Sequence, residues 1–151
     1  MGYMEKHEIE ILLIEDNLHE AELTIRSLKK HHLANRLKHI DDGEEALEFI
    51  FAPDPHPALP FNPKLILLDL KLPKVDGLEI LRKLKSIEAT KNIPVVVLTS
   101  SKEERDIIES YMLGVNSYIV KPVNFESFAQ AISELGLYWL ILNQHPAEAK
   151  D

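Results

Sequence analysis

The sequence has 151 residues, of which 45 % are hydrophobic and 28 % charged, and this is the composition of one folded domain with a single core. A formal net charge of -8 argues against broad nucleic-acid binding, which needs a basic surface, and the lack of cysteine excludes disulfides and thiolate metal sites. No apolar run is long enough to span a membrane and no signal segment begins the chain, so we expect a cytoplasmic protein.

The first part of the chain alternates between predicted strands and helices. Residues 8–14 (EIEILLI) become continuously apolar, as in a strand that is covered on both faces. A helix is predicted over residues 18–30, with Asn17 as its N-cap and Glu20 in a capping box. Residues 36–41 then alternate like an outer strand, and a second helix opens at Asp42.

A proline-rich segment separates this helix from the next strand. Residues 52–64 (APDPHPALPFNPK) contain five prolines, which remove amide donors and oppose both helix and sheet. We expect an exposed, fairly stiff loop inserted in the domain, with Phe61 packing back on the domain itself.

The remainder of the chain continues the alternation. Strands are predicted over residues 65–69, 93–99 and 115–120, and helices begin at Asp76, at the capping box of Ser101 and Glu104, and at Asn124. This order predicts an α/β, doubly wound fold with a five-stranded parallel sheet in the order 2-1-3-4-5, flavodoxin-like, with helices on both faces. The domain should run from 9 to 142, between tails at 1–8 and 143–151.

Polar residues stand at the carboxyl ends of four predicted strands. Glu15 and Asp16 follow the first strand, Asp69 ends the third, Thr99 ends the fourth and Lys121 follows the fifth. The carboxyl ends of parallel strands meet at one edge, so the three carboxylates should lie together at the switch point. Their repulsion would be relieved by a divalent cation, and oxygen ligands without His or Cys favour Mg²⁺. Such a site could accept a phosphoryl group, with Asp69 as the nucleophile and Lys121 beside its oxygens.

Each of these residues also has a structural interpretation. Glu15 and Asp16 could simply end a strand and cap a helix, and Asp69 could be a paired structural carboxylate. Thr99 and Tyr118 are residues that strands favour in any case. The coincidence of acids and a lysine at three strand ends favours the site.

Together these residues resemble the receiver domain of two-component response regulators, over residues 9–142. The motifs that carry the resemblance are Glu15, Asp16, Asp69, Pro73, Asp76, Gly77, Thr99, Tyr118, Lys121 and Pro122. The resemblance implies phosphorylation of Asp69 by a sensor histidine kinase, with Mg²⁺ held directly by Asp16 and Asp69. It further implies that Glu15 binds the ion through a water and that the Lys71 carbonyl completes the protein ligands. Thr99 and Tyr118 would form the switch pair, and the peptide bond between Lys121 and Pro122 would be cis.

Two features resemble a narrower group, the single-domain regulators that serve phytochrome-type kinases. These are the proline-rich insertion and the ending LGLYWLILNQ, after which no room is left for a DNA-binding domain. The last helix has a core-facing stripe and also apolar residues on its other faces, which are Leu137, Tyr138, Leu140 and Ile141. We expect these residues to form a homodimer or partner surface.

The sequence therefore predicts a signalling phosphoacceptor rather than an enzyme. Such a protein assists only its own phosphorylation and dephosphorylation. A downstream histidine-containing phosphotransfer protein is a further partner of such domains. One alternative is an adaptor that keeps the scaffold but works without phosphorylation. Another is a flavin or nucleotide carrier, which is disfavoured because no glycine-rich loop follows the first strand.

Overall fold

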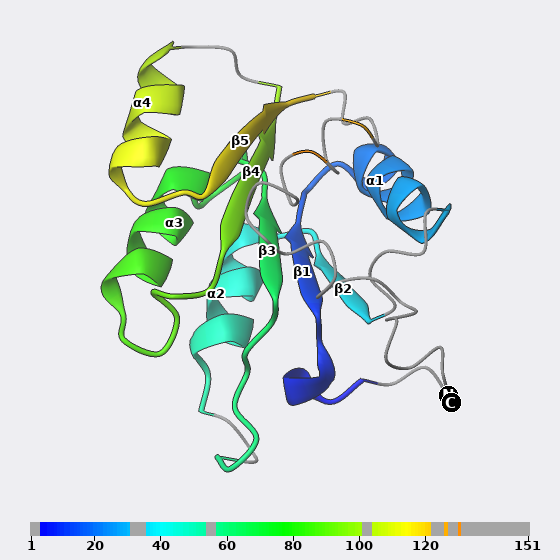
Figure 1. Ribbon diagram of the computed structural model, residues 1–151, viewed down its shortest axis with the longest axis vertical. Helices are drawn as coiled ribbons and strands as arrows, with labels where there is room; N and C mark the ends of the chain where they lie inside the picture. The colour runs from blue at the N-terminus through cyan, green and yellow to red at the C-terminus, as the bar shows by residue number, and fades with distance from the viewer. Residues whose placement is uncertain are drawn as a thin grey trace.

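The computed structural model describes residues 4–30, 36–53, 57–100 and 104–121, together with Glu126 and Gln130. Within these residues a five-stranded parallel sheet has the order β2-β1-β3-β4-β5 (Figure 1). Its strands are β1 (Ile11–Ile14), β2 (Leu37–Ile40), β3 (Leu65–Leu68), β4 (Val95–Thr99) and β5 (Ser117–Val120). The predicted fold class and strand order are confirmed.

Four α-helices are described in the same ranges. They are α1 (Leu18–Lys30), α2 (Gly43–Phe51), α3 (Gly77–Ser86) and α4 (Glu104–Met112). A short 3-10 helix, η1 (Lys6–Glu8), precedes β1, so the prediction that the first strand begins at residue 8 was wrong. The cause is local, because the Glu8 carboxylate accepts a hydrogen bond from the Glu5 N–H at 2.8 Å and closes a turn.

The two faces of the sheet bury two separate apolar clusters. Side chains alternate along each strand, so Leu12 and Ile14 pack on one face while Ile11 and Leu13 pack on the other. The face with Leu12 is covered by α2 and α3, and the opposite face by α1 (Figure 1). Burial on both faces explains why β1 and β3 are apolar throughout and why β4 is apolar up to its last residue, Thr99.

Three predicted helix starts have N-cap hydrogen bonds in the structure. The Asp42 carboxylate accepts from the N–H groups of the first turn of α2, and Asp76 accepts from the Leu78 N–H of α3 at 3.2 Å. Asn17 Oδ1 accepts from the Glu20 N–H at 3.0 Å and so caps α1. Each cap fixes where a helix starts relative to the carboxyl edge of the sheet.

Phe61 anchors the proline-rich segment to the domain, as predicted. The residue is 8 % exposed, and its ring packs edge-to-face on Phe49 of α2, with 5.7 Å between the ring centroids. The Lys6 ammonium lies 5.3 Å from the Phe49 centroid and 5.7 Å from that of Phe61. The described part of the segment, residues 57–64, thus lies at the amino-terminal side of the sheet and is attached there through Phe61 (Figure 1).

In the part of the chain that the structure describes, none of the helices has the length and apolar character needed to cross a membrane. Of the predicted last helix, only Glu126 and Gln130 are described, and both are helical.

Gly77 has no room for a side chain, because the chain after β3 folds closely over the start of α3. A Cβ atom at Gly77 would lie 2.4 Å from the Asp69 carbonyl oxygen, whereas one at Gly43 would meet its nearest atom, in Val75, at 3.1 Å. We expect Gly77→Ala to lower the free energy of unfolding by about 1–3 kcal/mol, measured by urea denaturation, because backbone must shift. Gly43→Ala, also at the first residue of a helix, should cost less. Equal stability of Gly77→Ala and wild type would contradict this packing.

Candidate functional site

Three carboxylates meet where β1 and β3 end. Ile14 is paired with Leu68 in the sheet, so the residues that follow these strands come out side by side. The Asp69 N–H donates to the Ile14 carbonyl at 3.0 Å, which fixes the backbone of Asp69 against the end of β1. Glu15, Asp16 and Asp69 each place a carboxylate oxygen within 4.8 Å of the others. The sequence prediction that these side chains lie together is confirmed by this geometry.

Two of these acids are almost completely buried, since Glu15 is 3 % and Asp69 5 % exposed. Burial, the largest effect, raises the pKa of Glu15 to about 7; the hydrogen bond from Lys121 opposes the rise and the charge of Asp69 adds to it. A buried pair of like charges costs free energy unless a cation is present. The cluster therefore has the charge and the oxygen donors of a site for a hard divalent ion.

Lys121 brings a cation to the same edge from the end of β5. Its N–H donates to the Thr99 carbonyl at 2.8 Å, and its side chain is 11 % exposed. The ammonium makes a very short contact with Glu15, lies 2.5 Å from Glu20 Oε1 and 3.4 Å from Asp69 Oδ2. Burial alone would lower the pKa of Lys121, but its hydrogen bonds to Glu15 and Glu20 and the charge of Asp69 raise it overall, so the ammonium stays charged.

Glu20 was not identified as a site residue from the sequence, because its spacing from Asn17 was explained by a capping box. Its N–H does meet the Asn17 side chain, but its carboxylate accepts a hydrogen bond from Lys121. No local signal in the sequence marks this contact, because it joins two residues that lie 101 positions apart.

The predicted switch residues lie on the two neighbouring strands at the far side of the sheet. Thr99 ends β4 and is fully buried, and Tyr118 is a half-buried residue of β5 that packs against the apolar cluster on the α3 side. Register pairs Tyr118 with Val97 and Thr99 with Val120, so the two residues are close along the strands.

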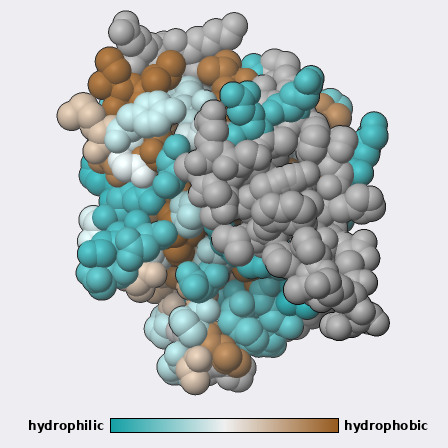
Figure 2. Space-filling view, in the orientation of Figure 1, coloured by the Kyte–Doolittle hydropathy of each residue, from teal (hydrophilic) through white to brown (hydrophobic). Residues whose placement is uncertain are grey.

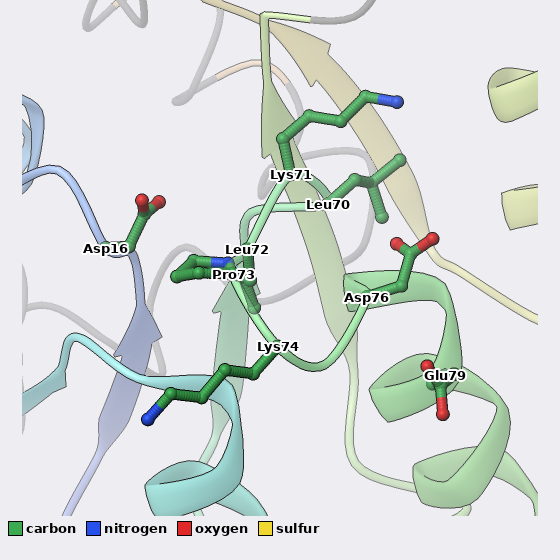
Figure 3. A pocket seen from close by; sticks show the side chains of 8 residues that line it. All are labelled: Asp16, Leu70, Lys71, Leu72, Pro73, Lys74, Asp76 and Glu79. Atoms are coloured by element: carbon green, nitrogen blue, oxygen red, sulfur yellow. The ribbon is translucent and has the colours of Figure 1, made fainter.

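The loop after β3 forms one wall of an open pocket beside the acids (Figure 3). Asp69 Oδ1 accepts a hydrogen bond from the Lys71 N–H at 3.3 Å, and Lys71 and Lys74 leave the loop in opposite directions (Figure 3). The Lys71 ammonium lies 3.3 Å from the buried carboxylate of Asp106 on α4. Lys74, with a positive φ of 66°, pairs with Asp42 at 3.3 Å.

Some predicted residues lie outside the part of the chain that the structure describes. They are Pro122, with the predicted cis peptide, and the surface residues Leu137, Tyr138, Leu140 and Ile141.

Comparison with known proteins places this geometry in a family. The family model for the response regulator receiver domain matches residues 11–133. A probable methanogenesis regulatory protein, FilR2 from Methanothrix harundinacea, is 39 % identical over 139 residues, covering 92 % of this chain and 88 % of the relative. The solved structure of the bacteriophytochrome response regulator AtBRR is 48 % identical, with a TM-score of 0.75, over 89 % of this chain and 97 % of that one.

A further similar protein is the response regulator Rcp1 from Synechocystis sp., which is 39 % identical over 130 residues, or 86 % of this chain and 88 % of Rcp1. Its Mn²⁺-bound structure and that of the phosphorylated cyanobacterial phytochrome response regulator RcpA both have a TM-score of 0.70, at 39 % identity over 87 % of this chain and 94 % of theirs. The strand order, the acidic edge and the match over most of the chain lead to one conclusion. This chain belongs to the family of response regulator receiver domains, the phosphoacceptors of two-component signalling.

Proposed function

We propose that Asp69 is the residue on which this receiver domain accepts a phosphoryl group from a sensor histidine kinase. The observation that carries the proposal is the position of Asp69, a buried carboxylate between two further acids and the Lys121 ammonium at the carboxyl edge of the sheet. A buried carboxylate held beside a cation is suited to nucleophilic attack on phosphorus, because its partners also neutralise the transferred group.

In the transfer, an Asp69 carboxylate oxygen forms a bond to phosphorus as the bond from phosphorus to the kinase histidine nitrogen breaks. The electron pair of that bond stays on the imidazole, and Asp69 becomes an acyl phosphate. Lys121 would turn its ammonium to a phosphoryl oxygen, since it already lies 3.4 Å from Asp69. Hydrolysis by water then returns the Asp69 carboxylate and releases inorganic phosphate, so the chain acts as a signalling protein that assists only its own turnover.

The donor set fits Mg²⁺. Asp16 and Asp69 would bind it directly, Glu15 through a water, and the Lys71 carbonyl would add a neutral oxygen. The fit rests on the three carboxylate oxygens within 4.8 Å of one another and on the raised pKa of Glu15, which reflects burial and crowding of negative charge. When bound, the ion supplies charge neutralisation for the phosphoryl oxygens. The Mn²⁺ form of Rcp1 supports a divalent ion in this family.

Output would pass through α4, β5 and the switch pair Thr99 and Tyr118. The ion pair between Lys71, two residues after Asp69, and Asp106 of α4 supports this route, because it connects the phosphorylated loop to the helix. Exposed apolar side chains of α4, including Ile108 and Met112, offer a surface for a partner, and hydrophobic atoms gather there at the upper left of Figure 2.

We further propose that the phosphodonor is a phytochrome-type kinase and that the phosphoryl group can pass to a histidine-containing phosphotransfer protein. The first proposal is supported by similarity to AtBRR, a bacteriophytochrome response regulator, at 48 % identity. The second follows from the chemistry, since an acyl phosphate can return its phosphoryl group to an imidazole nitrogen.

Asp69→Asn should abolish phosphorylation and keep the fold, because an amide is a poor nucleophile of the same shape. The measurement is intact-protein mass after incubation with acetyl phosphate and Mg²⁺, and with a phosphorylated phytochrome-type kinase compared with kinases of other sensor classes. Wild type should gain one phosphoryl group, fastest from the phytochrome-type kinase.

Asp76→Asn is the matched control, since Asp76 lies in the same loop and caps α3 through its side chain. It should still be phosphorylated. Labelling of Asp69→Asn at the wild-type level would refute the assignment. No labelling of folded wild type by any donor would favour the phosphorylation-independent adaptor.

Metal affinity should depend on pH through Glu15. Because the pKa of this buried acid is raised to about 7, it is protonated below that pH and must lose a proton before it can offset the charge of a cation. Mg²⁺ should therefore bind about tenfold more weakly at about pH 6 than at about pH 8, as measured by calorimetry. By the same shift, Glu15 stabilises the metal-free fold at low pH and loses this contribution as the pH rises through about 7.

Glu15→Gln should flatten this pH dependence. His39→Gln should retain it, because the hydrogen bond between the His39 ring and Glu15, at 2.8 Å, is made to the backbone carbonyl. Equal Mg²⁺ affinity of wild type at both pH values would contradict the assignment to Glu15.

We also propose a homodimer through the apolar residues Leu137, Tyr138, Leu140 and Ile141, which the sequence alone supports. Sedimentation should give a dimer for wild type, and Leu140→Glu should shift it towards monomer by placing a charge in an apolar interface. Leu59→Glu, at an exposed apolar residue of the proline-rich segment, is the control and should leave the dimer intact. A wild type that stays monomeric at high concentration, with and without phosphoryl analogue, would refute the proposal.

A further inference from the structure

Lys121 is shared between the phosphorylation site and a residue outside it. Its ammonium has three protons and contacts three carboxylates, those of Glu15, Glu20 and Asp69. Glu20 Oε1 lies 2.5 Å from the Lys121 nitrogen, whereas Asp69 Oδ2 lies 3.4 Å away. The ammonium is therefore held more closely by the helix α1 than by the residue that is to be phosphorylated.

Glu20 differs from the other two acids in its surroundings. It stands outside the group of Glu15, Asp16 and Asp69, whose carboxylate oxygens lie within 4.8 Å of one another. Its side chain is 42 % exposed, so solvent stabilises its charge whether or not Lys121 is in contact. Its backbone N–H donates to Asn17 Oδ1 at 3.0 Å, which places Glu20 in the first turn of α1, within reach of Lys121. The Glu20 carboxylate can thus form or break its ion pair with Lys121 at little cost to the stability of the fold.

We infer that Glu20 is a positioning residue that holds Lys121 towards α1 in the unphosphorylated protein and competes with the phosphoryl group for it. The inference rests on the proposed function of Asp69. For Lys121 to contact a phosphoryl oxygen on Asp69, the ammonium has to weaken its contact with Glu20. Part of the attraction between lysine and phosphoryl group is then offset by the lost ion pair, and the phosphorylated state is less favourable than the site could otherwise make it.

The contact between Glu20 and Lys121 also favours the return of the lysine side chain to its original position after dephosphorylation. When the phosphoryl group is hydrolysed from Asp69, the Glu20 carboxylate attracts the ammonium back towards α1. A partly exposed ion pair is a weak interaction, so Glu20 adjusts the stability of the phosphorylated state without blocking it.

The test is the affinity for beryllofluoride, a phosphoryl analogue, in the full chain with saturating Mg²⁺, followed by fluorine NMR of the bound group. We expect Glu20→Gln to bind it about two- to fivefold more tightly than wild type, the range that a partly exposed ion pair allows. Glu20→Asp keeps the charge, but its side chain is one methylene shorter and should lose the contact with Lys121. This variant should therefore show most of the increase in beryllofluoride affinity expected for Glu20→Gln.

Glu22→Gln is the matched control, because it removes the same charge from the next turn of α1, where Glu22 pairs with Arg26 at 3.8 Å. It should bind beryllofluoride like wild type. The initial rate of phosphorylation by acetyl phosphate should rise in Glu20→Gln and Glu20→Asp and stay unchanged in Glu22→Gln.

Three results would overturn the inference while leaving the proposed function intact: unchanged or weaker binding in Glu20→Gln, an equal gain in Glu22→Gln, or a Glu20→Asp variant that behaves like wild type. The last result would mean that the charge of Glu20 acts at a distance and not through contact with Lys121. A wild type that binds no beryllofluoride would instead overturn the proposed function, and the inference with it.

Discussion

The arrangement of this molecule depends on one electrostatic constraint, the convergence of buried negative charge at the carboxyl edge of an apolar sheet. Glu15 and Asp69 follow strands in which all four residues are buried, so their carboxylates have little solvent to stabilise them. The Lys121 ammonium offsets part of this negative charge, and a divalent ion can neutralise the remainder. The domain can thus fold with this site in place, and the negative charge that Lys121 does not offset is available to bind a divalent ion.

The loop after β3 holds Asp69 at this edge through backbone hydrogen bonds and close packing. The Lys71 N–H donates to Asp69, and the Gly77 N–H donates to the Leu70 carbonyl at 2.9 Å. The close approach at Gly77 packs the start of α3 directly beneath Asp69. The backbone of Asp69, the proposed phosphoacceptor, is therefore held by hydrogen bonds and close packing and not by a free loop.

The sheet, the caps and the three carboxylates could be predicted from the sequence because each has a local signal. Apolar runs define the strands, and topology alone brings Glu15 next to Asp69 once both are assigned to strand ends. The role of Glu20 and the pairing of Lys71 with Asp106 could not be predicted in this way. Both depend on where a long, flexible side chain turns after the backbone is placed, and several partners were within its reach.

The start of the first strand was misplaced for a related reason. The alternation in residues 8–14 matches a strand, but a reciprocal contact of Glu5 and Glu8 closes a turn first. Pattern matching weighs periodicity over a window, whereas a single side-chain-to-backbone hydrogen bond decides an element end.

The anchoring of Phe61 has a consequence for how this domain can vary in length. The proline-rich segment lies between the end of α2 and the start of β3, so its described residues are at the amino-terminal edge of the sheet, opposite the acidic edge (Figure 1). Lengthening a loop between fixed ends costs only about 0.6 kcal/mol for each doubling. Residues 57–60, which are exposed, are therefore a place where a reporter or an affinity tag could be inserted without disturbing the phosphorylation chemistry.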